Sequence, residues 1–360
     1  MLTVFIITAA FTALYFIYPL WLKSQSRCLY SEEEKNEPDG VSIVYLSQNS
    51  ESSLSHKIDF LLNEMNDFTH TELLLVDDGS EDRSIELLGR FKDNRLRVLS
   101  EKVPKGIAHS MNLGVELSKF EIIVFCDQRQ HLSKGIIGKI VDPLQYSEIG
   151  AVSSCISNVD KNNRFSYLRA HENFIKKEEG KTGNLIGVYG PLYALKKKCY
   201  KPIPEYIILD DLYLSLNILG SKKIVFMYDC QISDENMDLL YTYKRTKRYV
   251  TGFIQILKEK KLLAGLSAKQ ITMFFWHKYL RIVLPVLFLI SYIMLAANAF
   301  KDSTAFLFFL IISVFIAVAL FPSGIKNRSQ LGSIFRLITF YSVAVIEMLI
   351  LTIIKKNVNE

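Results

Sequence analysis

Hydrophobic positions gather into long runs near both ends of the chain and into short runs between them. The first long run covers residues 1–22 without a charged side chain, and three more cover residues 282–300, 304–321 and 337–354. Because about 20 apolar residues in a helix cross a bilayer core of ~30 Å, these runs predict an N-terminal transmembrane anchor and about three C-terminal transmembrane helices. A cleaved signal peptide is the alternative for the first run, but that run lacks a basic start and a small-residue cleavage pattern.

The region between the long runs follows two shorter periods. Largely apolar stretches, typical of strands buried on both faces of a parallel sheet, lie at residues 41–46, 72–76, 96–99 and 121–126. Apolar positions with helical spacing lie at residues 56–68, 84–91 and 107–117. The alternation predicts an α/β fold with a doubly wound sheet, and such sheets bind ligands at the carboxyl ends of their strands.

The pattern is looser after residue 127. It predicts strands at 151–154 and 224–228, helices at 165–177 and 208–219, and a long basic amphipathic helical region at 238–263. We divide the chain into an anchor (1–22), a linker (23–40), an α/β domain (41–235), an amphipathic, interfacial helical region (236–281) and a transmembrane region (282–354).

Composition agrees with a membrane protein that carries a polar domain. The 360 residues are 49% hydrophobic and 22% charged, which is too apolar for a purely soluble enzyme and too charged for an all-membrane protein. Basic side chains flank the first two runs, namely Lys23, Arg27, His277, Lys278 and Arg281. By the positive-inside rule they place the domain in the cytoplasm, at an inner or plasma membrane.

Cysteine usage and net charge exclude other classes. Five cysteines without metal-ligand spacing suit a reducing cytoplasm rather than a disulfide framework. The formal net charge of +6 comes from dispersed lysines rather than a basic block, which argues against a nucleic-acid partner. A basic surface facing anionic membrane lipids explains this charge as well.

Acidic residues follow two of the predicted strands and begin a later helix. Asp77 and Asp78 come after the second strand, Asp127 after the strand at 121–126, and Asp210 with Asp211 at the start of a helix. Carboxylates at strand ends can bind ribose hydroxyls or a divalent cation, and a separate carboxylate can act as a general base. The plain structural alternatives are turn formation for the first pair and helix capping for the last.

A basic cluster lies in the amphipathic region. Arg245 and Arg248 belong to it, and arginines can hold a diphosphate bidentately. With the acids, this cluster completes the parts of a glycosyl transfer from a nucleotide sugar. The alternative is a helix face that lies on anionic lipid. Glu347, inside the last apolar run, predicts a partner within the helix bundle because an ionisable group there is costly.

The order of these motifs resembles the family 2 glycosyltransferases, which are inverting enzymes with a GT-A fold. The resemblance is closest to their membrane-bound, exopolysaccharide-synthase-like members and covers about residues 41–276. The motifs are LLVDDGS at 74–80, EIIVFCDQRQ at 121–130, YGPLYAL at 189–195, LDDL at 209–212 and RTKRY at 245–249. The implied fold is a GT-A-like doubly wound mixed sheet flanked by transmembrane helices.

The resemblance also implies a role for each site residue. Donor-binding residues would be Asp77, Asp78, Asp127, Arg129, Arg245 and Arg248. Asp211 would be the catalytic base with Asp210 as its support, and Tyr189 and Gly190 would line the acceptor side. Mg²⁺ or Mn²⁺ would bind at Asp127 with the donor diphosphate.

Three positions depart from the family pattern. Arg129 stands where relatives carry a second carboxylate, which leaves Asp127 as the only expected protein ligand of the metal. Lys105 precedes Gly106, whereas relatives often carry a lysine after this glycine. The last motif has Arg245 for Gln and Tyr249 for Trp, which weakens the prediction of a processive enzyme.

The sequence therefore predicts a membrane-bound inverting glycosyltransferase. It would move a sugar from a nucleotide-diphosphate donor, expected to be UDP-linked, to a lipid-linked or growing glycan acceptor in exopolysaccharide or surface-glycan synthesis. A processive polysaccharide synthase is one alternative. Another is a catalytically silent homologue that scaffolds a polysaccharide assembly complex, and export or assembly proteins would be partners in either case.

Overall fold

The computed structural model describes most of the chain. The described residues are 2–25, 39–157, 166–233, 239–301, 303–307, 309–310, 313 and 338–347. Residues 26–38 of the predicted linker lie outside them, as do most of the predicted span at 304–321 and residues 337 and 348–354 of the last one.

An eight-stranded mixed sheet forms the centre of the domain, in the order β3-β2-β1-β4-β7-β6-β8-β5. The strands are β1 (Val41–Ser47), β2 (Thr71–Asp77), β3 (Leu96–Ser100), β4 (Ile122–Asp127), β5 (His131–Leu132), β6 (Ile149–Ser157), β7 (Leu192–Lys196) and β8 (Lys223–Ser233). β1, β2, β3 and β4 pair in parallel, whereas β7 runs antiparallel to both of its neighbours. Nearly every residue of β1, β2 and β4 is buried, as expected for strands covered on both faces.

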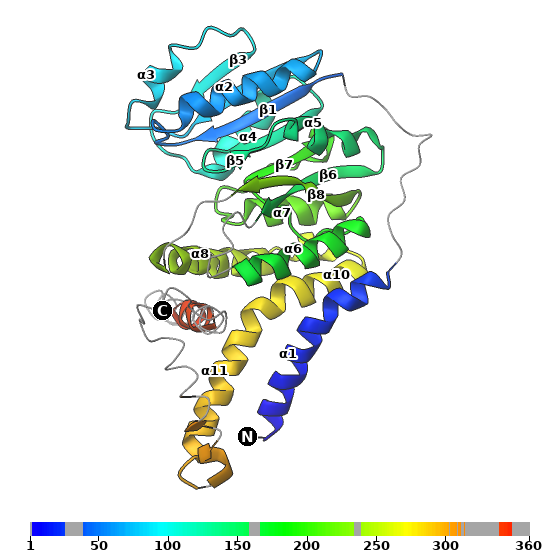
Figure 1. Cartoon of the computed structure of the whole chain (residues 1–360), viewed down its shortest axis with the longest axis vertical. Coiled ribbons are helices and arrows are strands. Elements are labelled where there is room, and N and C mark those ends of the chain that lie inside the picture. Colours follow the sequence, from blue (N-terminus) through cyan, green and yellow to red (C-terminus); the bar gives the residue numbers. More distant parts are fainter. Residues whose placement is uncertain are drawn as a thin grey trace.

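Helices cover both faces of this sheet (Figure 1). They are α2 (Leu54–Glu64), α3 (Ser84–Leu88), α4 (Ile107–Leu117), α5 (Ile136–Val141), α6 (Ser166–Lys181) and α7 (Asp210–Leu219), with 3₁₀ turns η2 (Met65–Asp67), η3 (Asp142–Gln145) and η4 (Lys197–Cys199). β2 and β4 lie on opposite sides of β1, so right-handed crossovers place α2 and α4 on opposite faces. The predicted doubly wound α/β fold is confirmed.

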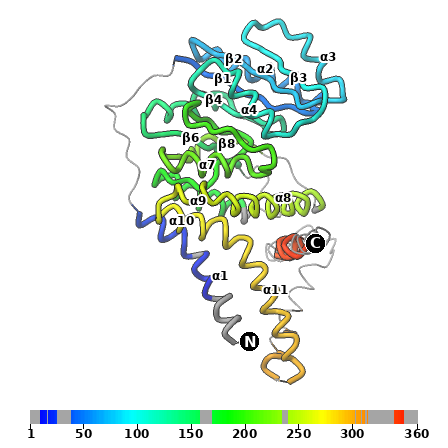
Figure 2. The backbone as a smooth tube through the Cα atoms, turned by 180° about the vertical axis from the view of Figure 1, so that it is seen from behind, coloured from blue at the N-terminus to red at the C-terminus, as the bar shows by residue number. Residues whose placement is uncertain are grey.

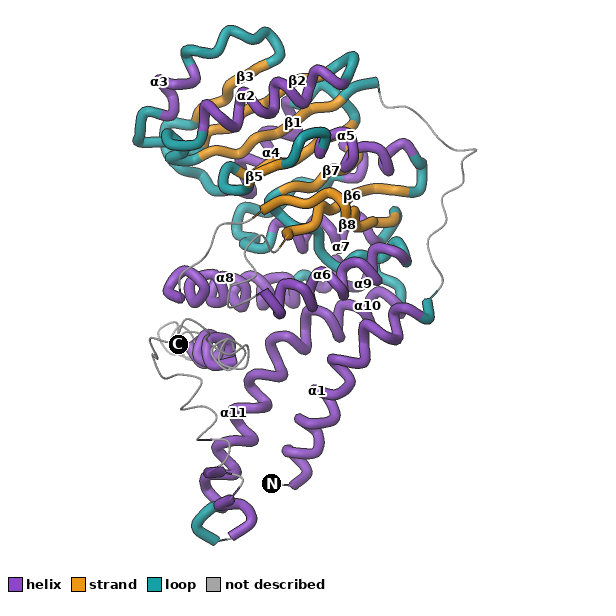
Figure 3. Tube along the Cα trace, viewed as in Figure 1, coloured by secondary structure: helices purple, strands orange, loops and turns teal. Residues whose placement is uncertain are grey.

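A helical layer follows the sheet (Figure 3). It contains α8 (Leu239–Lys258), α9 (Lys260–Ala264), α10 (Ala268–Phe274), the π-helical turn η5 (Phe275–Tyr279) and α11 (Leu280–Asn298). The helical region predicted at 238–263 consists of two helices, because the backbone of Glu259 departs from helical geometry and separates α8 from α9. Tyr206 donates a 2.6 Å hydrogen bond to the carboxylate of Glu259 at this break.

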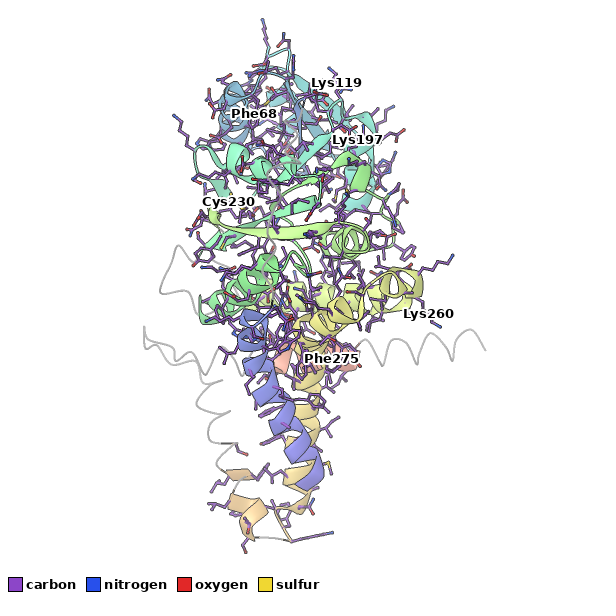
Figure 4. The ribbon with its side chains drawn as sticks, turned by 90° about the vertical axis from the view of Figure 1, so that its right-hand side faces the viewer. Phe68, Lys119, Lys197, Cys230, Lys260 and Phe275 are labelled. Carbon is purple, nitrogen blue, oxygen red and sulfur yellow. The ribbon has the colours of Figure 1, made fainter. Side chains whose placement is uncertain are left out.

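Two long helices extend away from the domain. α1 (Leu2–Lys23) and α11 pack against each other and project from the same side, with Phe275 where they meet the domain (Figure 4). Among the described residues, Ala268–Asn298 is the one helix long and apolar enough to cross a membrane. It begins at Ala268 rather than at Ile282, because α10, η5 and α11 are continuous.

The basic residues expected to flank the second span are not all exposed. His277 is 0% and Lys278 is 6% exposed, because both pack against α6 inside the protein. They flank the second run as predicted, but they are paired with Glu172 of α6.

The described part of the last predicted span has a different direction. The Ile338–Glu347 helix is seen end-on beneath α8 in opposite views, whereas α11 runs along the long axis (Figures 1 and 2). Glu347 accepts a 2.6 Å hydrogen bond from the Tyr243 hydroxyl and pairs with Lys247, both on α8. The prediction that Glu347 has a partner is confirmed, and that partner is the interfacial helix.

Candidate active site

The predicted donor acids meet at one edge of the sheet. Asp77 at the end of β2 pairs with Ser47, and Asp127 at the end of β4 pairs with Leu46, so both acids flank the end of β1. The strand order reverses between β1 and β4, and this is the position where open α/β sheets bind ligands.

Asp77 holds the turn that follows β2. Its side chain is fully buried, and its Oδ2 accepts hydrogen bonds from the Ser80 amide (3.1 Å) and the Ser100 hydroxyl (3.3 Å). The Ser80 hydroxyl also donates to this carboxylate. Asp77 therefore fixes the shape of the turn rather than facing the open site.

Asp78 is tied to the start of α4. Its carboxylate accepts hydrogen bonds from the amides of Lys105 (2.7 Å) and Gly106 (3.0 Å), which precede the helix. The ammonium group of Lys105 pairs with Glu101 at 2.9 Å instead of pointing to Asp78. Asp78 thus links the end of β2 to the loop before α4, and it lies next to the end of β1.

Asp127 and Arg129 form an ion pair at the mouth of the site. Arg129 Nη2 lies 3.1 Å from Asp127 Oδ2, and the two side chains are 48% and 30% exposed. The second guanidinium nitrogen donates to the hydroxyl of Tyr241 on α8. Both charged groups are therefore accessible to a ligand, and α8 lies close to them.

The donor set for a metal ion at this edge is small. No group of three or more His, Cys, Asp or Glu side chains that could hold a metal ion is found in the part of the chain that the structure describes. Asp127 offers one accessible carboxylate, and Mg²⁺ commonly binds through one or two carboxylates with substrate phosphates. The site therefore fits a divalent cation that arrives with a diphosphate.

One short loop joins the two acidic parts of the site. The Asp127 amide donates a 2.9 Å hydrogen bond to the carbonyl of Pro191. A Cβ atom added to the neighbouring Gly190 would lie 3.6 Å from Asp211 Oδ2. In the loop before β7, Pro191 thus contacts the predicted donor acid Asp127, and the preceding residue, Gly190, lies beside the predicted base Asp211.

Asp210 and Asp211 begin α7 and have different surroundings. Asp210 is 8% exposed, and burial together with the neighbouring Asp211 charge raises the pKa of Asp210 to about 7. The charge of Arg248 opposes this shift. At neutral pH the pair therefore favours one negative charge over two, and Asp211, which is more exposed, is the better position for it.

One face of α8 passes across these residues. Tyr241, Arg245, Arg248 and Gly252 share this face by their i, i+4, i+7 and i+11 spacing. Tyr241 contacts Arg129, and Gly252 packs against Leu209, the residue before the acid pair. Arg245 and Arg248 lie between these two contacts, so the sequence reading of α8 as part of the site agrees with its position.

A family model matches most of the α/β domain. Residues 42–202 match the model described as glycosyl transferase family 2. The chain carries a family 2 glycosyltransferase domain. The matched segment runs from β1 to the residues after β7 and so includes the acids at the ends of β2 and β4.

Curated relatives of this glycosyltransferase agree. A glycosyltransferase named GlyG from Streptococcus pneumoniae is 28% identical over 36% of this chain and 42% of its own length. Poly-beta-1,6-N-acetyl-D-glucosamine synthase of Staphylococcus epidermidis is 21% identical over 78% of this chain and 72% of its own. An Escherichia coli UDP-Glc:alpha-D-GlcNAc-diphosphoundecaprenol beta-1,3-glucosyltransferase, WfaP, is 21% identical over 64% of this chain and 87% of its own. The chain spans about two fifths of the first two curated relatives it matches.

A solved structure shares the fold of the glycosyltransferase. The mannosyltransferase PcManGT from Pyrobaculum calidifontis, in complex with GDP-Man and Mn²⁺, aligns with a TM-score of 0.75 at 19% identity over 96% of this chain and 99% of that one. The predicted GT-A-like mixed sheet is thus confirmed.

Tyr189 of the glycosyltransferase is placed differently from what its motif suggests. It is 7% exposed, and its hydroxyl donates a 2.8 Å hydrogen bond to Asn173 on α6. Gly190 is the member of the pair that lies beside Asp211. Tyr189 therefore supports the loop from behind rather than presenting its hydroxyl to an acceptor.

Several residues near the site were missed by sequence reasoning. They are Lys176 and Asn173 on α6, Ser215 on α7 and Tyr241 on α8. The helical spacing of Ser215 from Asp211 was a usable signal, since residues four apart on a helix are neighbours. No local pattern identifies Lys176, because a lysine in a charged helix predicts a solvent-facing side chain.

Proposed function

We propose that the glycosyltransferase transfers a sugar, with inversion, from a UDP-linked donor to a hydroxyl group of a lipid-linked or growing glycan acceptor at the cytoplasmic face of an inner or plasma membrane. The observation that carries the proposal is the loop before β7, which contacts Asp127 through Pro191 and Asp211 through Gly190. This arrangement supports a site in which Asp127 would bind the donor and Asp211 would act as the base from two sides of one short segment.

Asp211 takes the proton of the acceptor hydroxyl in this reaction. The acceptor oxygen attacks the anomeric carbon as the bond from that carbon to the diphosphate oxygen breaks, and the diphosphate leaves with the electron pair. Asp210, whose pKa is raised to about 7, holds its proton in about half of the molecules at pH 7, and in these the negative charge of the pair lies on the base.

The donor diphosphate would lie between Asp127 and the site face of α8. Arg129, Arg245 and Arg248 supply positive charge there, and Asp78 stabilises the turn next to the nucleotide. Asp127, with phosphate oxygens of the donor, would hold a Mg²⁺ or Mn²⁺ ion, and this ion would neutralise charge on the leaving diphosphate. The Mn²⁺ named for the mannosyltransferase structure supports this assignment.

The acceptor class follows from two relatives and from the helical layer. The Escherichia coli relative is named for a diphosphoundecaprenol acceptor, and the Staphylococcus relative for a polysaccharide product. The apolar helix Ala268–Asn298 and the adjoining α8 support a site that opens near a membrane surface, with residues 41–235 as the catalytic domain and residues 282–354 in the membrane. We favour addition of one sugar, and polymerisation is the second candidate because the Staphylococcus match extends over the helical region.

Nucleotide release by membranes that contain the protein tests the proposal. A panel of nucleotide sugars is supplied with and without total lipid extract and with Mg²⁺ or Mn²⁺, and products are sized by mass spectrometry. We expect release with one donor that depends on the lipid extract, and addition of a single sugar; long products would favour the synthase.

Variants locate the base in the same assay. Asp211→Asn is expected to lower turnover by about 10²- to 10⁴-fold while nucleotide-sugar binding is retained. Asp59→Asn, an exposed aspartate on α2, is the matched control and should leave turnover unchanged. Binding without turnover for every donor would instead support a scaffolding homologue.

A further inference from the structure

Lys176 is a buried lysine that the proposed reaction does not use. It is 2% exposed, donates a hydrogen bond to the carbonyl of Gly187, and its Nζ lies 4.4 Å from the ring centre of Tyr189. Burial and the nearby Lys278 charge lower the pKa of Lys176 to about 7. Burial of an amine costs free energy unless hydrogen bonds or other polar contacts offset the loss of water. The two contacts of Lys176 with the loop before β7 are therefore the ones that offset this cost.

The same loop is attached to the helix that carries the proposed base. The Val188 amide donates to the Ser215 hydroxyl at 3.0 Å, and this hydroxyl donates to the carbonyl of Asp211 at 2.6 Å. On the other side, the Tyr189 amide donates to the Ser153 hydroxyl on β6 at 2.8 Å. Ser215 therefore connects the loop before β7 to the start of α7.

The apolar helix reaches this loop directly. A Cβ atom on Gly187, whose φ of +90° suits glycine, would lie 3.5 Å from Lys278 Cε in η5. The ammonium group of Lys278 lies 3.2 Å from the Glu172 carboxylate on α6. Glu172 also pairs with Arg281 at 3.3 Å, so α6 and the start of α11 are held together beneath the loop.

We propose that Lys176 is a positioning residue which, with Lys278, holds residues 187–190 against Asp211, so that the acceptor side of the site depends on how the apolar helix packs on the domain. Only the expected effect on kinetics rests on the proposed function; the contacts of the two lysines with the loop do not. Donor binding at Asp78 and Asp127 involves neither lysine, so loss of Lys176 should affect the acceptor step and leave donor affinity intact.

Replacement of Lys176 by methionine tests this assignment. Lys176→Met keeps most of the side-chain length and removes the charge and the hydrogen bond. We expect lipid-extract-dependent nucleotide release to fall by about 10- to 100-fold, with a higher apparent KM for the lipid extract and an unchanged Kd for the nucleotide sugar. Lys278→Met is the second variant, with the same expected direction, in case Lys176→Met does not fold.

Lys196→Met is the matched control. Lys196 is also buried, at 8% exposed, and also donates to a backbone carbonyl, that of Tyr146 at 2.6 Å. It is the last residue of β7 and pairs with Ile122 at the start of β4, opposite the end of β4 that carries Asp127. Its replacement is expected to lower stability without changing the KM for the lipid extract.

Hydrogen–deuterium exchange of the segment 185–192 separates the two proposals. Faster exchange in Lys176→Met, but not in Lys196→Met, supports the positioning role. This holds even if the unmodified protein turns over no donor. Lack of turnover would contradict the proposed function but not the positioning role. Unchanged exchange with unchanged lipid-dependent release would overturn the inference. A loss of donor affinity equal to the loss of release would overturn it too.

Discussion

Two adjacent carboxyl groups at the start of α7 have different environments, and this difference is the main electrostatic feature of the site. Asp210 is buried next to Tyr193 and Asp211, whereas Asp211 faces the loop at Gly190. A carboxyl group that is desolvated beside a second carboxylate holds its proton to higher pH. Asp210 thus contributes a neutral acid at a pH where Asp211 acts as base.

The raised pKa of Asp210, about 7, predicts a pH-dependent stability. Its contribution is fully present below the unfolded pKa of about 3.9 and is lost as the pH rises through about 7, because the folded state holds the proton longer. Asp210→Asn cannot titrate, so its stability relative to the unmodified protein should rise by on the order of 1 kcal/mol per pH unit across this window.

Thermal unfolding in detergent at pH 5 and pH 8 measures this effect. The melting temperature of Asp210→Asn, relative to that of the unmodified protein, should be higher at pH 8 than at pH 5. The exposed Asp59→Asn on α2 serves as the control and should show no such trend. A parallel trend in both variants would contradict the assignment.

At the scale of elements, α8 has two faces with different partners. The face with Arg245 and Arg248 passes over the proposed donor site, and the opposite side contacts Glu347 through Tyr243 and Lys247. The periodicity of the sequence predicted an amphipathic basic helix here, but it could not divide the basic residues between the two faces, because both sides carry cations. Lys247 pairs with Glu347, whereas Arg245 and Arg248 are the cations of the face that we propose for the donor.

Gly252 sets the distance between α8 and the acid pair. A Cβ atom there would lie 2.6 Å from Leu209 Cγ and 3.2 Å from the Leu209 amide nitrogen. Gly252→Ala should therefore push α8 away from the residues before Asp210, lowering stability by about 1–3 kcal/mol and reducing turnover.

Gly138→Ala is the control for the effect of an alanine in a helix. Gly138 is in α5, and a Cβ atom there meets nothing within 4 Å. Its replacement should be neutral or stabilise by up to about 1 kcal/mol. Thermal unfolding and nucleotide release are compared for both variants, and equal behaviour would show that the close packing of α8 is not required.

The whole molecule is joined through a buried polar cluster between α1, α6 and η5. Glu179 on α6 is 0% exposed and accepts hydrogen bonds from the Tyr18 hydroxyl on α1 (2.7 Å) and the Ile186 amide (3.0 Å). His277 Nδ1 in η5 lies 2.8 Å from the same carboxylate. One side chain therefore connects the first helix, the domain and the apolar helix.

Removal of Glu179 should loosen this junction. Glu179→Ala leaves buried polar partners without their acceptor and is expected to cost about 3–5 kcal/mol of stability. Glu178→Ala is the neighbouring control, since Glu178 pairs only with Lys181 of its own helix among its ion pairs with described residues, at 2.7 Å, and should cost less. Thermal unfolding in detergent compares them; equal losses would argue against Glu179 as the junction.

The sequence by itself determined the parallel strands β1 to β4 and the acids that follow β2 and β4. Buried parallel strands are continuous apolar runs, and turn residues mark their ends, so both signals are local. The bounds predicted for the helix 107–117 agree with α4, and β1, β2 and β4 differ from prediction by about a residue. Strand β7 and the short elements α5 and β5 were not predicted. Both α5 and β5 are too short to show a period.

Only the tertiary structure decided how the charges are shared among elements. Glu172 and Glu179 belong to a helix whose sequence is typical of a solvent-facing element, and their partner His277 is about one hundred positions away. Burial of charged groups is stable only when opposite charges and hydrogen-bond partners meet them in the folded chain. Lys176, Tyr189 and Lys278 acquire their positions around the loop in the same way, because no local pattern records which distant side chains will surround a residue.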